Sequence, residues 1–311
     1  NAFKQFTEGL GFTKQAMNIT IWGNVLNILI ALVLVRGMFG FPEMGIRGVG
    51  IATLVDRILM MLVMAAYVLR SKNFKRYMVD FSIRFIDRIR VKNIFKIGAP
   101  VAMQYVFEIG AFATAALIAG KIGALEQAAH QVAITLAAMT YMMASGLASA
   151  ATIKTGNSFG TGNFQRLQKF AMVSYSLVLV FMIFWAIVFA LFNQYLPIAI
   201  TRDTEVIAIA ASLLIIAGMF QLFDGTQVVG LGVLRGMGDV NVPTAITFVA
   251  YWIVGVPSAY VMGLVFDWGI QGVWYGLTLG LLTSTALLYW RYKTIIARKI
   301  KSTVRLQAHG A

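Results

Sequence analysis

Eight apolar runs, each about as long as a membrane-spanning helix, divide this chain. They cover residues 17–36, 48–69, 97–119, 127–151, 170–196, 206–231, 244–266 and 271–290. A helix of about 20 apolar residues crosses a bilayer, whereas the strands of a membrane barrel would read as short alternating segments. Only helices and closed barrels satisfy their backbone hydrogen bonds in lipid. The sequence therefore predicts an all-α, polytopic membrane protein with eight transmembrane helices.

The composition agrees with this fold class. Hydrophobic residues make up 59% of the chain and charged residues only 12%, against about 25% charged residues in soluble domains. The chain has no cysteine and two histidines, and it carries no nucleophile elbow, Walker loop or metalloenzyme spacing. We therefore expect neither an enzyme nor a bound cofactor.

The basic residues predict the topology in the membrane. With alternate loops assigned to opposite sides, one side carries segments 70–96 and 291–311 and most of the other Lys and Arg residues. The opposite side carries only Arg36, Arg47, Lys121 and Arg202. Cytoplasmic loops are enriched in Lys and Arg, so we expect both ends of this chain to be cytoplasmic. This pattern accounts for the net charge of +14 through topology and contact with membrane lipid, and no nucleic-acid partner is expected.

Two short glycine signals recur in the same order. The glycines of EGLGFT (8–13) match those of RGMGDV (235–240), and GIRGV (45–49) matches GIQGV (269–273). The corresponding apolar runs begin on the same side of the membrane, which predicts a parallel repeat. The second copy has four further runs before its first signal, so we expect four more helices before Asn1 and twelve in all, in two six-helix lobes. The alternative is a chance match of small residues.

The repeat predicts four parts. Residues 1–69 would be the last two helices of the N-terminal lobe, and 70–96 a basic cytoplasmic linker between the lobes. Residues 97–290 would form the six-helix C-terminal lobe, and 291–311 a basic cytoplasmic tail.

Two carboxylates, Glu108 and Asp224, each stand alone inside an apolar run. An unpaired charge at the centre of a membrane helix costs about 2.5–3.5 kcal/mol on insertion scales, and such a residue usually faces a cavity, a partner or an ion. We expect Glu108 and Asp224 to bind a coupling proton or cation, with Na⁺ as the metal. The alternative is that each carboxylate only hydrogen-bonds a neighbouring helix.

Amide side chains accompany both acids at helical spacing. Gln104 precedes Glu108 by four residues, and Gln221 and Gln227 flank Asp224 at three residues on either side. Residues three or four apart share a helix face, so we expect these amides to support the acids. Interhelical hydrogen bonds, worth about 0.6 kcal/mol each on average, are the alternative.

Other residues are candidates for a substrate cavity. Thioethers repack easily and aromatic faces attract cations, which favours a set of four residues: Tyr105, Met139, Tyr141 and Met142. Ordinary helix packing is the alternative for each. His130 is more typical of a satisfied hydrogen bonder than of a proton relay, and the adjacent Asp56 and Arg57 favour a structural role.

The stretches that hold these residues resemble the multidrug and toxic compound extrusion (MATE) family. The resemblance lies in GAPVAMQYVFEIGAF (98–112), AAHQVAITL (128–136), MMASGLASAATIKTGNSFGTGN (142–163) and DGTQVVGLGVLRGMGD (224–239). It implies twelve helices, of which this chain would supply the fifth to the twelfth. In the norfloxacin-exporting branch, acids in the seventh and tenth helices bind the coupling cation, and Glu108 and Asp224 match those positions.

The function that the resemblance implies is secondary active antiport. Cationic or amphiphilic drugs would leave the cell in exchange for Na⁺ or H⁺, through a protein of the bacterial inner membrane that we expect to be a monomer. A lipid-linked oligosaccharide flippase or polysaccharide exporter of the same superfamily is the alternative, although a pyrophosphate group would favour a more basic cavity. A membrane receptor or scaffold without transport activity is a third class.

Overall fold

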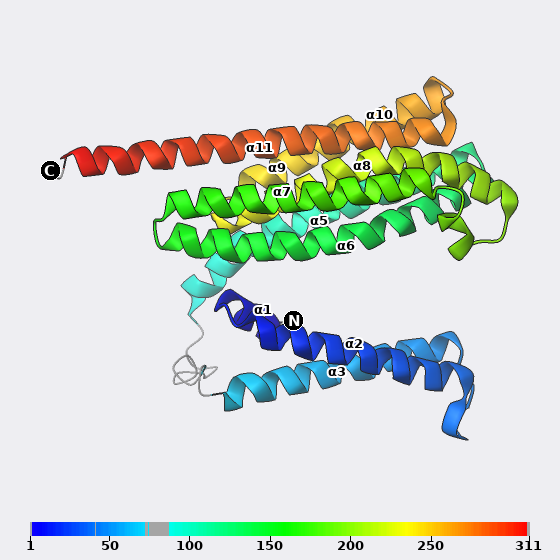
Figure 1. Cartoon of the computed structure of the whole chain (residues 1–311), viewed down its shortest axis with the longest axis horizontal. Coiled ribbons are helices and arrows are strands. Elements are labelled where there is room, and N and C mark those ends of the chain that lie inside the picture. Colours follow the sequence, from blue (N-terminus) through cyan, green and yellow to red (C-terminus); the bar gives the residue numbers. More distant parts are fainter. Residues whose placement is uncertain (1, 41, 72–73, 75–86, 310–311) are drawn as a thin grey trace. The chain divides into compact units, whose positions relative to one another are not determined.

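The computed structural model describes residues 2–40, 42–71, 74 and 87–309, and it is helical apart from short turns (Figure 1). Within these ranges no strand occurs, so the all-α prediction is confirmed. The chain forms two compact units, Asn1–Val91 and Lys92–Ala311. Most of the predicted linker 70–96 lies outside the described residues, and its last part is already helical.

The N-terminal unit is built on one pair of long helices. Its elements are α1 (Ala2–Gly9), α2 (Thr13–Arg36), the short η1 (Met38–Gly40) and α3 (Ile46–Arg70). Gly37 ends α2 in the left-handed region, at φ 64°, a conformation that costs glycine little. The chain then turns, and the Met44 amide donates to the Leu34 carbonyl at 3.0 Å, so that α2 and α3 lie side by side.

The C-terminal unit is a helical bundle. Its elements are α5 (Arg88–Ile122), α6 (Ala124–Gly160), α7 (Phe164–Leu191), η3 (Leu196–Ala199), α8 (Thr204–Gly236), α9 (Asn241–Phe248), η4 (Val249–Gly255), α10 (Val256–Tyr260), η5 (Val261–Val265) and α11 (Gly269–His309). The segments η4 and η5 are π-helical, so Asn241–Val265 is one helical rod with two widened stretches.

Seven of the described helices are long and apolar enough to cross a membrane, whereas the sequence predicts eight. The difference lies in the run 271–290, which is helical throughout as part of α11 but is not among the seven. Its glycine, threonine, tyrosine and tryptophan residues lower its mean hydropathy. The helix α11 also continues through the predicted basic tail as far as His309.

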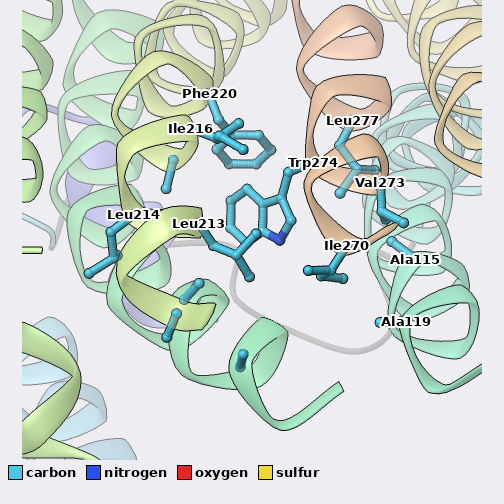
Figure 2. Packing of buried hydrophobic residues seen from close by; sticks show 14 of the residues in the cluster. Ala115, Ala119, Leu213, Leu214, Ile216, Phe220, Ile270, Val273, Trp274 and Leu277 are labelled. Atoms are coloured by element: carbon cyan, nitrogen blue, oxygen red, sulfur yellow. The ribbon is translucent and has the colours of Figure 1, made fainter. Parts of the chain in front are cut away.

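Helix α8 is the centre of the bundle and packs on α6, α7 and α11. In its most apolar stretch 56% of the residues are buried. Figure 2 shows Trp274 of α11 against Phe220 and Leu213 of α8, and the Trp274 and Phe220 ring centroids lie 5.3 Å apart. Small residues bring the backbones close, as expected where lipid rather than water surrounds the helices.

The glycines of α11 give a test of this packing. A Cβ atom on Gly276 would collide with the backbone of Ala259. We expect Gly276→Ala to destabilise the bundle by about 1–3 kcal/mol, the usual cost of overpacking, and to lower the melting temperature of the purified protein. The matched control is Gly146→Ala, because a Cβ there meets nothing within 4 Å. Equal melting temperatures for the two variants would contradict this account of the α10–α11 contact.

Candidate functional site

A cavity of about 490 Å³ opens among α5, α6 and α8, and both predicted acids lie in its wall. We call it the large cavity. Helices α5 and α6 supply most of its lining, and α8 supplies the rest: Tyr105, Glu108, Ile109, Phe112, Ala113, Ala116, His130, Gln131, Ile134, Ala137, Ala138, Tyr141, Met142, Phe220 and Asp224. This volume is within the range of small-molecule pockets, which are mostly apolar with a few polar groups.

The two carboxylates come from different helices and are both buried. Glu108 of α5 is 8% exposed and Asp224 of α8 is 6% exposed. Their neighbours in the wall include the aromatic rings of Phe112 and Phe220, whose centroids lie 5.9 Å apart. Apolar walls weaken dielectric screening, so two carboxylates here attract a cation more strongly than they would in water. Oxygen ligands also suit a hard cation, and the Tyr141 hydroxyl adds another oxygen beside Glu108.

A second, narrow cavity adjoins the large one, because Tyr105, Glu108 and Tyr141 line both. Its volume is about 20 Å³, which is roughly the space for one water molecule. The remaining lining comes from α5, α6 and α8: Gln104, Ser145, Ala148, Ser149, Val228, Leu231 and Arg235. Glu108 thus faces a space large enough for a drug and a polar space that admits only a water-sized species.

Gln104 supports this second cavity. Its Nε2 donates to the Thr244 hydroxyl at 3.0 Å and to the Val240 carbonyl at 3.3 Å, while its Oε1 accepts from Arg235 Nη2 at 3.3 Å. Gln104 and Glu108 lie on one face of α5 and share the narrow cavity, as their spacing predicts. Gln104 therefore connects α5 with the end of α8 and the start of α9.

The glutamines beside Asp224 have different surroundings. Gln221 Oε1 accepts from the Thr140 hydroxyl of α6 at 2.9 Å, and Gln227 Oε1 accepts from the Tyr251 hydroxyl of η4 at 2.9 Å. Neither glutamine lines the large cavity. The structure thus assigns both amides to interhelical hydrogen bonds that hold α8 and leaves Asp224 alone of the three in the cavity wall.

Three of the four residues predicted to line a substrate cavity do so in the structure, and one does not. Tyr105, Tyr141 and Met142 line the large cavity. Met139 is 63% exposed and lies outside the wall of either cavity. The structure adds His130, which is 1% exposed and lines the large cavity with its ring centroid 5.7 Å from that of Trp274.

Asp56 and Arg57 are neighbours on α3 of the N-terminal unit, and their side chains have different surroundings. Asp56 is 2% exposed and lines a cavity of about 280 Å³ between α2 and α3, together with Asn18. Arg57 lines a different and smaller space. The two side chains thus line different spaces within the N-terminal unit.

The MatE family model matches residues 100–261 of the chain, a segment that contains both cavities and both acids. The chain belongs to the MatE family. It is 32% identical over 295 residues to the probable multidrug resistance protein NorM of Xylella fastidiosa, covering 95% of this chain and 63% of that protein. The chain is thus similar to a MatE relative and spans less than two thirds of its length.

Two further bacterial relatives of this MatE chain carry the same kind of name. The probable multidrug resistance protein NorM of Pseudomonas putida is 32% identical over 316 residues, covering 99% of this chain and 68% of that protein. The multidrug resistance protein NorM of Aliivibrio fischeri is 34% identical over 293 residues, covering 93% of this chain and 64% of that protein.

Solved structures confirm the MatE fold. The eukaryotic MATE transporter AtDTX14 has a TM-score of 0.86 and 21% identity, covering 97% of this chain and 67% of its own. An outward-facing multidrug resistance MATE transporter of the MOP superfamily has a TM-score of 0.86 and 19% identity, covering 96% of this chain and 66% of its own. At these identities the likeness concerns the fold alone.

The hydrogen bond from Tyr251 to Gln227 allows a test of how α8 is held. Tyr251→Phe leaves the buried Gln227 Oε1 without its donor. We expect a loss of about 0.6–1.7 kcal/mol, the span from average to maximum for interhelical hydrogen bonds in a membrane protein, measured as a lower melting temperature. Tyr260→Phe on the same rod is the control, because Tyr260 is 48% exposed. An unchanged melting temperature for Tyr251→Phe would show that this bond does not hold α8.

Proposed function

We propose that this MatE chain takes part in secondary active multidrug export, in which a cationic or amphiphilic drug leaves the cell in exchange for Na⁺ or H⁺. One observation carries the proposal: Glu108 and Asp224 are buried in the wall of a single, mostly apolar cavity of about 490 Å³. An acidic site with apolar and aromatic walls suits a ligand that combines a positive charge with a hydrophobic body.

Exchange follows from competition for the same carboxylates. The positive group of a drug and the coupling ion both gain from neutralising Glu108 and Asp224, so binding of one disfavours binding of the other. A ligand shifts a conformational equilibrium only by its differential affinity for the two states. If the two cations favour states open to opposite sides of the membrane, movement of one lobe relative to the other gives alternating access.

The charge of the large cavity argues against the flippase alternative. Its two carboxylates, Glu108 and Asp224, would repel a pyrophosphate group, and the basic Arg235 lines the narrow cavity instead. The names of the relatives, which are multidrug resistance proteins, support the same choice.

The proposed setting is the inner membrane of a bacterium. The chain is a multi-span membrane protein whose basic residues concentrate on one side of the predicted topology, which supports cytoplasmic positions for both of its ends. Its relatives are bacterial. We propose that it works as a monomer among membrane lipids.

Neutralising either acid tests the coupling role. We expect Asp224→Asn and Glu108→Gln each to weaken binding of ethidium to the purified protein by roughly tenfold or more, equivalent to about 1.4 kcal/mol, and to abolish drug resistance in cells that express the gene. Membrane insertion should be unchanged, because neutral amides insert more easily than carboxylates. Glu205→Gln is the control, since Glu205 lies exposed in the first turn of α8. Unchanged ethidium binding and resistance in both acid variants would refute the proposal.

Filling the large cavity tests the drug site separately from its charge. Ala116 lines the cavity, and Ala116→Trp would occupy part of its volume while both acids remain. We expect binding of the bulky ethidium cation to weaken by roughly tenfold and competition by the small tetramethylammonium cation to be affected much less. Val180→Trp on α7, where Val180 is 68% exposed, is the control. Equal losses for both cations would show that the volume of the cavity does not select ligands.

A further inference from the structure

Arg235 is a basic residue at the end of α8 that reaches into the narrow cavity. Its Nη2 donates to Gln104 Oε1 at 3.3 Å, and its guanidinium carbon lies 5.8 Å from the centroid of the Tyr105 ring. Its Nε is buried and has no hydrogen-bond partner among the described residues. The guanidinium is therefore held at one edge by a neutral amide, while its Nε donor meets no acceptor in the described part of the chain.

Glu108 is the acid that lines the narrow cavity together with Arg235. Asp239, four residues after Arg235, is taken by Arg291, whose Nε donates to Asp239 Oδ2 at 2.7 Å. Asp224 lines only the large cavity, whereas Glu108 lines the narrow cavity together with Arg235. Among the residues that the structure describes, Glu108 is the one acid that lines the narrow cavity.

Gln104 and Glu108 lie one above the other on α5, four residues apart, which is about 6 Å along a helix axis. Tyr105 and the hydroxyl side chains of Ser145 and Ser149 line the same cavity. The cavity holds only about one water molecule, but Arg235 is itself part of its wall. The guanidinium would therefore reach the carboxylate by a change of its own rotamer, with neighbouring side chains moving aside.

We propose that Arg235 is a tethered cation that competes with the transported cations for Glu108. In the structure Arg235 donates to Gln104, and the ion pairs of the described residues do not include Arg235 with Glu108. When neither a drug nor a coupling ion is bound, Arg235 leaves Gln104 and pairs with Glu108, so that the empty site does not carry two bare carboxylates. An arriving cation must then displace Arg235. This inference rests on the cation-binding role proposed above for Glu108.

In this scheme Gln104 holds Arg235 through the hydrogen bond from Arg235 Nη2 to Gln104 Oε1, and we call this contact the latch. Its Nε2 is fixed by Thr244 and by the Val240 carbonyl, so its Oε1 faces the guanidinium in a set position. The amide thereby stabilises the state in which Glu108 is free to bind an external cation. Removing the latch and removing the tethered cation must therefore change cation affinity in opposite directions, which a merely structural role for these residues does not predict.

The first arm of the test changes Arg235 and measures ethidium binding to the purified full chain at constant pH. Arg235→Gln removes the competitor, so we expect ethidium to bind roughly fivefold more tightly, or better, a typical magnitude for coupling between sites. Arg235→Lys keeps a tethered cation and should bind ethidium within about twofold of the wild-type chain. Unchanged or weaker binding in an Arg235→Gln protein that is monodisperse and melts normally would overturn the proposal.

The second arm changes the latch and is independent of whether Arg235→Gln folds. Gln104→Leu frees Arg235 to pair with Glu108, so we expect ethidium to bind roughly fivefold more weakly. The double variant Gln104→Leu with Arg235→Lys keeps a positive charge tethered beside Glu108. We therefore expect the weakening of ethidium binding to remain largely in place. Wild-type or tighter binding by Gln104→Leu would overturn the proposal.

A Glu108→Gln background separates this inference from the function on which it rests. There, Arg235→Gln and Gln104→Leu should each leave ethidium affinity unchanged, because the residue for which Arg235 competes is gone. If Glu108→Gln itself binds ethidium like the wild type, the proposed function fails at this residue. If Glu108→Gln abolishes binding but the Arg235 and Gln104 variants do not move affinity in opposite directions, only the tethered-cation inference fails.

Discussion

Burial of carboxylates among apolar helices is the constraint on which the arrangement of the C-terminal unit depends. A lone charge in such surroundings is unfavourable by several kcal/mol unless a partner or an ion compensates for it. Glu108 and Asp224 are both less than a tenth exposed, and they come from α5 and α8, which the fold brings to one cavity. In the proposed function, the same arrangement favours a positively charged ligand at this cavity.

The position of Asp224 depends in turn on how α8 is held. Gln221 binds α6 through Thr140, and Gln227 binds η4 through Tyr251. Close contacts add to this, since a Cβ on Gly232 would meet the carbonyl oxygen of Ala148 at 2.5 Å. With α8 fixed against its neighbours on several sides, the carboxylate has one direction left open, which is the large cavity. Its geometry is therefore set by helix contacts on the other faces of α8.

Much of this organisation could be predicted from the sequence because it follows from local patterns. The apolar runs predict the helices, and an isolated acid such as Glu108 predicts a cavity or partner on that face. The four-residue spacing of Gln104 and Glu108 places both correctly in one space. The run 271–290 shows the limit of such patterns, because α11 is a long helix whose small and aromatic residues give it a weaker hydropathy signal.

What sequence patterns could not show is which neighbour each polar group meets. The same three-residue spacing that links Gln221, Asp224 and Gln227 predicts one polar face, yet each of the three faces a different helix or space. Met139 and Met142 are the same residue type and lie three positions apart, but of the two only Met142 lines the large cavity. From the sequence, Arg235 is one of many basic residues at predicted cytoplasmic helix ends. The structure shows that it shares the narrow cavity with Glu108 of α5.

The position of Arg235 bears on how many cations the site needs. Two ionised carboxylates facing one cavity would require two monovalent cations for neutrality, whereas a drug with a single positive charge supplies one. In the proposed scheme Arg235, which lines the narrow cavity together with Glu108, lowers this requirement by one charge without leaving the protein. Because Arg235 is part of the chain, its contribution does not depend on the concentration of any external cation. Asp224, which lines only the large cavity, is then the carboxylate whose charge an external cation must always balance.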